Sequence, residues 1–225
     1  MKKPLRTRTN ELGLFGQVND AMFNHLSGAG ALADKLTAAG ERAGNAAPPI
    51  VSYVTDGMAG GTDLTGTSSS SPVLSSAVQL TTKTTLTISD SSTSSGVIWE
   101  GGGSEVGSVM YIHEGVLYVH GCNGAAISSS SSVNMQYTLP ASGTFVAEAV
   151  ITPTAGALYI DGVEVSRGTG NGHKNAAGVN PGGIARAYGN IAANFAGWTD
   201  DGQGVFNETI DEIIVWKDQI PEGWS

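Results

Sequence analysis

The feature that most constrains the fold is a two-residue link, Asp161-Gly162, between short runs of Leu, Tyr, Ile and Val. Such a link is the strongest local signal for a β-hairpin, because a type I′ turn needs positive φ at both central residues. A second stretch, residues 207–216, has the alternation of a strand, with Ile210, Glu212, Ile214 and Trp216 on one side. Both stretches predict antiparallel β-structure.

Composition agrees with one β domain plus an appendage. The chain has 225 residues, 40% of them hydrophobic, which is enough for a sizeable core. Its 32 glycines are about twice the usual share of ~7%, which predicts many tight turns. The single cysteine, Cys122, excludes an internal disulfide framework and is interpreted as a small residue in or beside a strand.

Charge is distributed unevenly along the chain. Residues 1–50 hold six Lys or Arg and four Asp or Glu, a net charge of +2. Residues 51–225 hold five Lys or Arg and sixteen Asp or Glu, a net charge of −11. An acidic body repels nucleic acid and anionic membranes, so we expect neither as a partner. No apolar run is long enough for a transmembrane helix or a signal peptide, and we expect assembly in a cytoplasm.

The first fifty residues differ from the rest. A basic arm, residues 1–10, precedes an apolar stripe of helical spacing over residues 11–27, with Asn10 as N-cap, and a weaker helix over 31–43. Helices this short are marginal alone, so their apolar face must dock on the protein's own β body or on another subunit. The residues expected to anchor the chain are Lys2, Lys3, Arg6, Arg8, Leu14, Phe15, Val18, Met22, Phe23 and Leu26.

From residue 51 onward the pattern changes to short runs of period two separated by turn residues, including a second hairpin link at Glu114-Gly115. Strands at spacings of ~8–12 residues without intervening helices are typical of an antiparallel sandwich or jelly roll. We therefore expect a mainly β, two-sheet antiparallel sandwich over 51–225, with an N-terminal arm and a short helical segment. Before the Asp161-Gly162 hairpin, the expected strands are 51–54, 73–80, 84–88, 96–99, 108–112, 116–120, 133–139 and 144–151.

These strands resemble the concanavalin A-like lectin/glucanase superfamily, specifically its laminin-G-like jelly-roll domains. The resemblance is carried by residues 116–119, 139–151, 156–165 and 209–216, and it covers roughly residues 51–220. It departs from the family where Phe145-Val-Ala-Glu148 replaces a Trp-His-His element. The resemblance implies the fold, but that fold hosts lectins, hydrolases and inert spacers alike.

Catalysis is not expected. Retaining glycosidases of this superfamily hold two carboxyls about 5–5.5 Å apart. Here Asp211 and Glu212 are neighbours that point to opposite faces, and Glu208 lies about 13 Å from Glu212 along a strand. The four histidines have no metal-binding spacing.

Two ligand sites are considered on residues 188–204. The resemblance implies a calcium site, and Asp200 and Asp201 on a glycine-rich loop offer the hard oxygen ligands that Ca²⁺ needs, although an acidic solvated turn has the same pattern. For a glycan we expect Trp198 with Asp200 and Tyr188, the alternative for Trp198 being core packing. No other cofactor is expected.

Three functional hypotheses follow. The first is a non-enzymatic virion protein, a tailed-phage capsid decoration or fibre-like accessory whose residues 1–50 bind capsid or tail subunits. The second is a carbohydrate-binding module for host-surface or environmental glycans, and the third is an enzyme. We favour the first, located in the virion, and leave open whether the chain forms a homo-oligomer.

The first hypothesis predicts the effect of a deletion. A chain without residues 1–50 should keep a folded β body but no longer associate with particles, because the basic arm and the apolar stripe are removed. Light scattering and co-sedimentation with particles would measure both properties. A truncated chain that still loads normally would remove the anchoring hypothesis.

Overall fold

A computed structural model describes residues 54–67, 72–103, 106–123, 131–175, 183–185 and 204–224. The chain divides into two units, Met1–Pro49 and Ile50–Ser225, and every described residue belongs to the second. The arm and helices expected in residues 1–50 therefore lie outside the described residues and stay predictions. Within the described ranges, no helix is long and apolar enough to cross a membrane.

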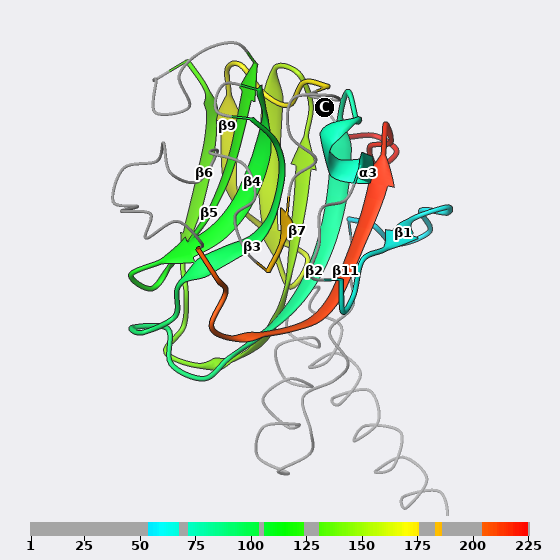
Figure 1. Ribbon diagram of the computed structural model, residues 1–225. Coiled ribbons are helices and arrows are strands. Elements are labelled where there is room, and N and C mark those ends of the chain that lie inside the picture. Colours follow the sequence, from blue (N-terminus) through cyan, green and yellow to red (C-terminus); the bar gives the residue numbers. More distant parts are fainter. Residues whose placement is uncertain are drawn as a thin grey trace, which may run out of the picture. The chain divides into compact units, whose positions relative to one another are not determined.

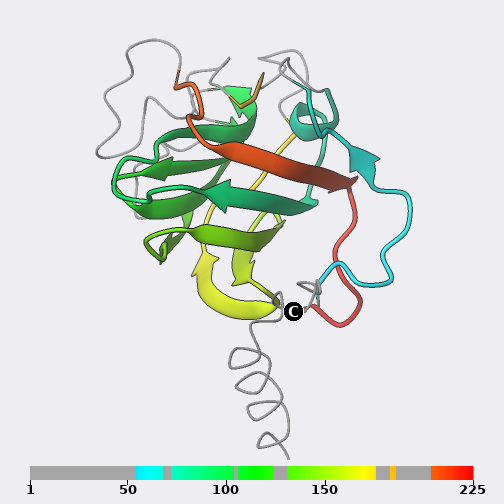
Figure 2. The same cartoon turned by 90° about the horizontal axis from the view of Figure 1, so that it is seen from below.

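Two antiparallel sheets form the body, which confirms the predicted sandwich (Figure 1 and Figure 2). The larger sheet has the order β1 (Thr62–Asp63), β11 (Thr209–Lys217), β2 (Leu80–Ile88), β7 (Gly143–Ile151), β8 (Ala155–Ile160) and β9 (Val163–Thr169). The smaller has the order β10 (Gly183–Ile184), β3 (Gly96–Gly103), β4 (Val106–His113), β5 (Val116–Asn123) and β6 (Val133–Thr138).

The core lies between the two sheets. On β2 the buried residues Leu80, Leu86 and Ile88 alternate with Lys83 and Thr87, which are partly exposed. This period of two puts one side of each strand inside, where burial of apolar area supplies the driving force. The inward side chains of the smaller sheet include Ile98, Trp99, Met110, Ile112, Leu117, Val119, Val133 and Met135.

Both predicted hairpins are confirmed. Asp161 and Gly162 have φ of 50° and 78° and join β8 to β9. Glu114 and Gly115 have φ of 47° and 77° and join β4 to β5. Positive φ at both turn residues matches the right-handed twist of the strands, so each turn sets the register of its hairpin.

The strand expected over 73–80 is wrong. Pro72–Ser75 form a short helix, α3, and β2 begins at Leu80 and runs unbroken to Ile88. Proline is favoured in the first turn of a helix, because its fixed φ is helical and no hydrogen bond is lost there. Leu74 of this helix is fully buried against Gly101, where a Cβ would lie 2.6 Å from the Leu74 Cβ.

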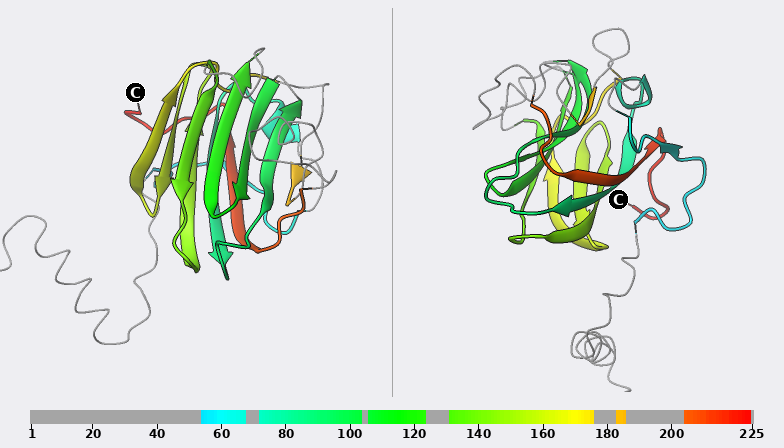
Figure 3. Two further views of the ribbon diagram at one scale, coloured as in Figure 1. Left: turned by 90° about the vertical axis from the view of Figure 1, so that its left-hand side faces the viewer. Right: turned by 60° about the horizontal axis from the view of Figure 1, so that its bottom comes forward.

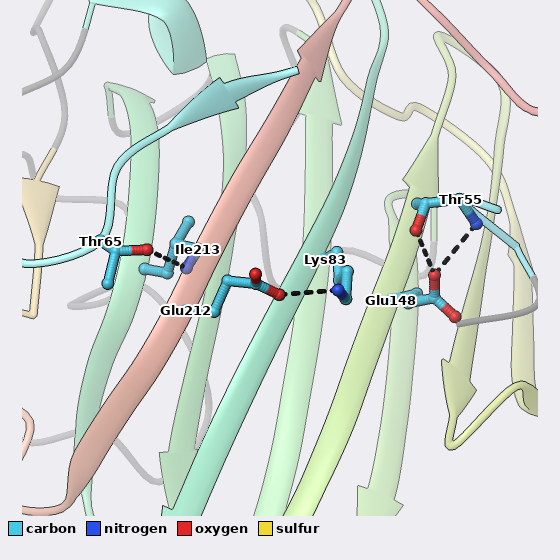
Figure 4. A network of polar contacts seen from close by, with 6 residues as sticks. All are labelled: Thr55, Thr65, Lys83, Glu148, Glu212 and Ile213. Carbon is cyan, nitrogen blue, oxygen red and sulfur yellow. Dashed lines mark hydrogen bonds and ion pairs between the residues drawn. The ribbon is translucent and has the colours of Figure 1, made fainter. Parts of the chain in front are cut away.

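Residues 54–67, called the strap below, contact the larger sheet at two places, which Figure 4 shows: Thr55 at β7, and Thr65 at β11. Thr55 donates two hydrogen bonds to Oε1 of the buried Glu148, from its backbone N–H at 3.0 Å and its hydroxyl at 2.7 Å. Further along the strap, the Thr65 hydroxyl accepts the backbone N–H of Ile213 at 3.0 Å. These bonds fasten the strap to two different strands of the sheet.

A β-bulge changes which side of β11 faces the core. Its pairing with β2 shifts between Ile210 and Glu212, so the predicted strict alternation is broken there. Ile210 packs against the core before the bulge and Ile213 is a core residue after it. Trp216 lies on the outer side, where it is 5% exposed because Gly61 of the strap covers it.

Leu86 provides a test of the core. Truncation to Ala should lower the free energy of unfolding by about 2–5 kcal/mol, because the fully buried side chain leaves a cavity between the sheets. Urea unfolding measures the change. Val163→Ala, at a side chain that is 64% exposed, is the control and should change stability by under about 0.5 kcal/mol. Equal losses in the two variants would contradict this assignment of the core.

Candidate functional site

The site residues predicted from the sequence lie outside the described residues. This holds for the anchor residues Lys2, Lys3, Arg6, Arg8, Leu14, Phe15, Val18, Met22, Phe23 and Leu26, for the glycan candidates Trp198, Tyr188 and Asp200, and for the calcium candidates Asp200 and Asp201. The structure brings none of them together in a described site, and all stay predictions. Within the described part of the chain, no cluster of His, Cys, Asp and Glu is arranged to hold a metal ion.

The outer face of the smaller sheet, whose strands Figure 3 (left) shows as ribbons, carries a different group of residues. Tyr111 on β4 faces Tyr118 on β5, which in turn faces Gln136 on β6. In a neighbouring row, His120 on β5 faces Asn134 on β6. These five residues are called the aromatic face below.

The three rings of the aromatic face stack in parallel. Ring centroids lie 4.9 Å apart for Tyr111 and Tyr118, 5.7 Å for Tyr111 and His120, and 5.8 Å for Tyr118 and His120. Interplanar angles are only 13–15°. Mutual stacking of this kind stabilises the rings and fixes their orientation before any ligand arrives.

A chain of polar contacts orients His120. The Asn134 amide nitrogen donates to the Ser132 carbonyl at 3.0 Å, so the amide oxygen faces His120 Nδ1 and accepts its proton. Nε2 is then the acceptor, 3.4 Å from the Tyr111 hydroxyl. Burial lowers the pKa of His120 to about 4, against the opposing effect of the Asn134 hydrogen bond, so the imidazole is neutral at pH 7.

Exposure is graded across the aromatic face. Tyr111 is buried, Tyr118 and His120 are half-buried, and Asn134 and Gln136 are exposed. Solvent therefore meets the outer parts of a rigid ring stack beside two amide side chains, each with donors and an acceptor. This surface can form hydrogen bonds with an uncharged, hydroxyl-rich ligand and can contact its apolar parts.

Three acids lie in β11 or directly before it, and each has its own partners. Glu208 accepts hydrogen bonds from the hydroxyls of Ser89 and Ser94, at 2.7–2.9 Å. Asp211 accepts one from Thr87, and Glu212 forms an ion pair with Lys83 at 2.7 Å. Each of the three carboxylates contacts a different set of neighbours, and no two of them share a site.

A serine–histidine pair also occurs, but inside the protein. The Ser108 hydroxyl lies 2.8 Å from His173 Nδ1, and His173 Nε2 lies 3.1 Å from the Ala77 carbonyl. That carbonyl accepts the Nε2 proton, so Nδ1 accepts the hydroxyl proton. Both side chains are at most 1% exposed, which closes them to substrate. The pair links β4 to the segment after α3 and is structural.

No family model matches the chain, and no curated protein sequence matches it. Among solved structures it is similar to the CBM40 of the Ruminococcus gnavus IT-sialidase bound to α2,6 sialyllactose, at 10% identity and a TM-score of 0.48, covering 72% of this chain and 92% of that one. It is also similar to domain 4 of AbnA, a GH43 extracellular arabinanase from Geobacillus stearothermophilus, in complex with arabinotriose. That match has 15% identity and a TM-score of 0.39, and it covers 74% of this chain and 75% of that one. A third similar structure is the mouse laminin α1 chain, domains LG4-5. That match has 14% identity and a TM-score of 0.36, and it covers 80% of this chain and 49% of that one.

Sequence reasoning missed the aromatic face although the signal was present. A two-residue hairpin at Glu114-Gly115 places residues at equal distances from the turn opposite each other, so Tyr111 must face Tyr118. Strand alternation then puts His120 on the same side as Tyr118.

The buried histidines predict a pH dependence of stability. Burial lowers the pKa values of both His120 and His173 to about 4, below their unfolded value of 6.5. Between pH 6.5 and 5 the unfolded chain therefore binds more protons than the folded chain. The free energy of unfolding should decrease as the pH is lowered through this range, by up to about 1.4 kcal/mol per pH unit for each histidine.

Urea unfolding from pH 6.5 to 5 measures that slope. His120→Gln removes one of the two titrating groups and should roughly halve it. A slope that is unchanged in this variant would show that His120 does not titrate as described.

Proposed function

We propose that the sandwich binds a carbohydrate on its aromatic face. The observation that carries the proposal is the rigid stack of Tyr111, Tyr118 and His120 with the exposed amides of Asn134 and Gln136 beside it. Sugars combine apolar C–H surfaces with many hydroxyls, and binding sites for such ligands combine aromatic side chains with a few oriented polar groups.

Solvent exposure of the aromatic side chains supports a binding role over a purely structural one. Tyr118 and His120 are half-buried on a sheet surface that is not part of the hydrophobic core. Because the rings already stack on one another, binding a ligand costs little further side-chain entropy, which favours affinity.

The proposed role is binding without catalysis. The aromatic face carries neutral hydrogen-bonding groups. Asp211 and Glu212 on β11 of the other sheet, and Glu208 directly before that strand, have neighbours of their own. Two of the similar solved structures hold sialyllactose and arabinotriose. The support for a sugar here comes from the residues of this chain.

Glycan binding can be tested on the full chain. It should be retained on an array of neutral and sialylated oligosaccharides, and the best ligand should then be titrated by calorimetry. Tyr118→Ala should weaken binding about tenfold, equivalent to about 1.4 kcal/mol, and Gln136→Ala severalfold. Val78→Ala, 52% exposed and remote from the aromatic face, is the control.

Thermal unfolding of each variant separates lost binding from lost folding, and Gln136→Ala guards against a Tyr118 variant that unfolds. Retention on no glycan, or full affinity in both variants, would overturn the proposal.

A second proposal keeps the expected anchoring role of residues 1–50 in a virion. The observation behind it is the difference in charge along the chain, a net +2 over residues 1–50 against a net −11 over residues 51–225. Capsid or tail partners and the virion location stay proposals with it.

A further inference from the structure

A second candidate site lies on the opposite side of the sandwich, independent of the aromatic face. A cleft of 530 Å³ is bounded by the start of the strap, by the β8–β9 hairpin and by residues 218–224, called the tail below. Figure 2 shows the strap in cyan and the tail in red next to each other there. Its lining includes Asp56, Met58, Tyr159, Glu222 and Trp224. The volume is within the ~300–1,000 Å³ of small-molecule sites.

Trp224 is held in place although it is the penultimate residue. Its Nε1 donates to the Tyr159 hydroxyl at 3.1 Å, and the Arg167 guanidinium lies 5.2 Å from the ring centroid. Arg167 makes two hydrogen bonds to Glu164, at 2.9 and 2.8 Å. The contacts with Tyr159 and Arg167 therefore pre-position the indole as one wall of the cleft.

The charge around the cleft is negative. Asp56 and Glu222 line it and are exposed, and the described residues that line it include neither Lys nor Arg. The neighbouring cation, Arg167, is neutralised by its ion pair with Glu164. Like-charge repulsion therefore disfavours an anionic ligand, whereas a cation is attracted by both carboxylates.

Aromatic walls and carboxylates together select one class of ligand. The face of an indole ring attracts cations, and Trp224 already interacts with one, the Arg167 guanidinium. Tyr159 supplies a second ring and Met58 a polarizable thioether for the apolar part of a ligand. We propose that the cleft binds an organic cation, an alkylammonium group of the choline type, between the Trp224 and Tyr159 walls and the Asp56 and Glu222 carboxylates.

The test compares choline with 3,3-dimethylbutan-1-ol, a neutral molecule of the same shape, by calorimetry on the full chain. Choline should bind at least tenfold more tightly, because the positive charge is what the ring and the carboxylates recognise. Its affinity should fall as salt is raised. Equal affinity for the two molecules would overturn the proposal, because the cleft would then be an apolar site only.

Variants locate the binding. Trp224→Leu should weaken choline binding about tenfold, and Asp56→Asn combined with Glu222→Gln about fivefold, while Val78→Ala leaves it unchanged. The acid substitutions are on exposed side chains and keep the fold, so they test the site even if the indole is needed for local order. No choline binding to the native chain, or unchanged binding in both variants, would overturn the assignment. Glycan binding on the aromatic face is measured separately with Tyr118→Ala, so either proposal can fail alone.

Discussion

The structure depends on β2, an inner strand of the larger sheet that pairs with the last strand of the described chain. It pairs with β11, which lies some 120 residues later in sequence, on one side, and with β7 on the other. Closing so long a loop costs entropy, which the two backbone ladders and the core contacts of Leu80, Leu86 and Ile88 offset. The other strands of the larger sheet are positioned relative to β2 by backbone pairing. The smaller sheet is positioned relative to it by packing in the core. A sheet of this kind is stable only when its inner face is covered by the other.

The two outer faces of the sandwich differ in which residues they carry and in what covers them. On the larger sheet, the strap covers Glu148 and Trp216, and a cleft lies where the strap, the tail and the β8–β9 hairpin meet. The smaller sheet has neither strap nor tail across it, and its half-exposed residues Tyr118 and His120 stack on Tyr111. A carbohydrate and an organic cation would thus meet separate surfaces with opposite requirements: neutral hydrogen-bonding groups on one side and negative charge beside indole on the other.

The candidate sites show how far sequence reasoning reached. The aromatic face follows from local rules, because a two-residue turn at Glu114-Gly115 sets the register that brings Tyr111 to Tyr118. The cleft does not, because Asp56, Tyr159 and Trp224 come from three distant segments whose proximity depends on the strap bond from Thr55 to Glu148 and on the tail contact of Trp224 with Tyr159. The sites expected from isolated residues at 188–204 and in the first fifty residues lie outside the described part of the chain.

By itself the sequence determined the class of fold, both hairpin turns and most strand positions, because positive-φ turn residues and period-two alternation act over a few neighbouring residues. Only the tertiary structure decided that Leu74 of the helix over residues 72–75 packs on Gly101, and that a bulge in β11 brings Ile210 and Ile213 to the same, core-facing side. It also decided which charged groups lie together, such as Lys83 with Glu212, and that Glu148 is buried beneath Thr55. These features depend on contacts between segments far apart in the chain, which no local pattern encodes.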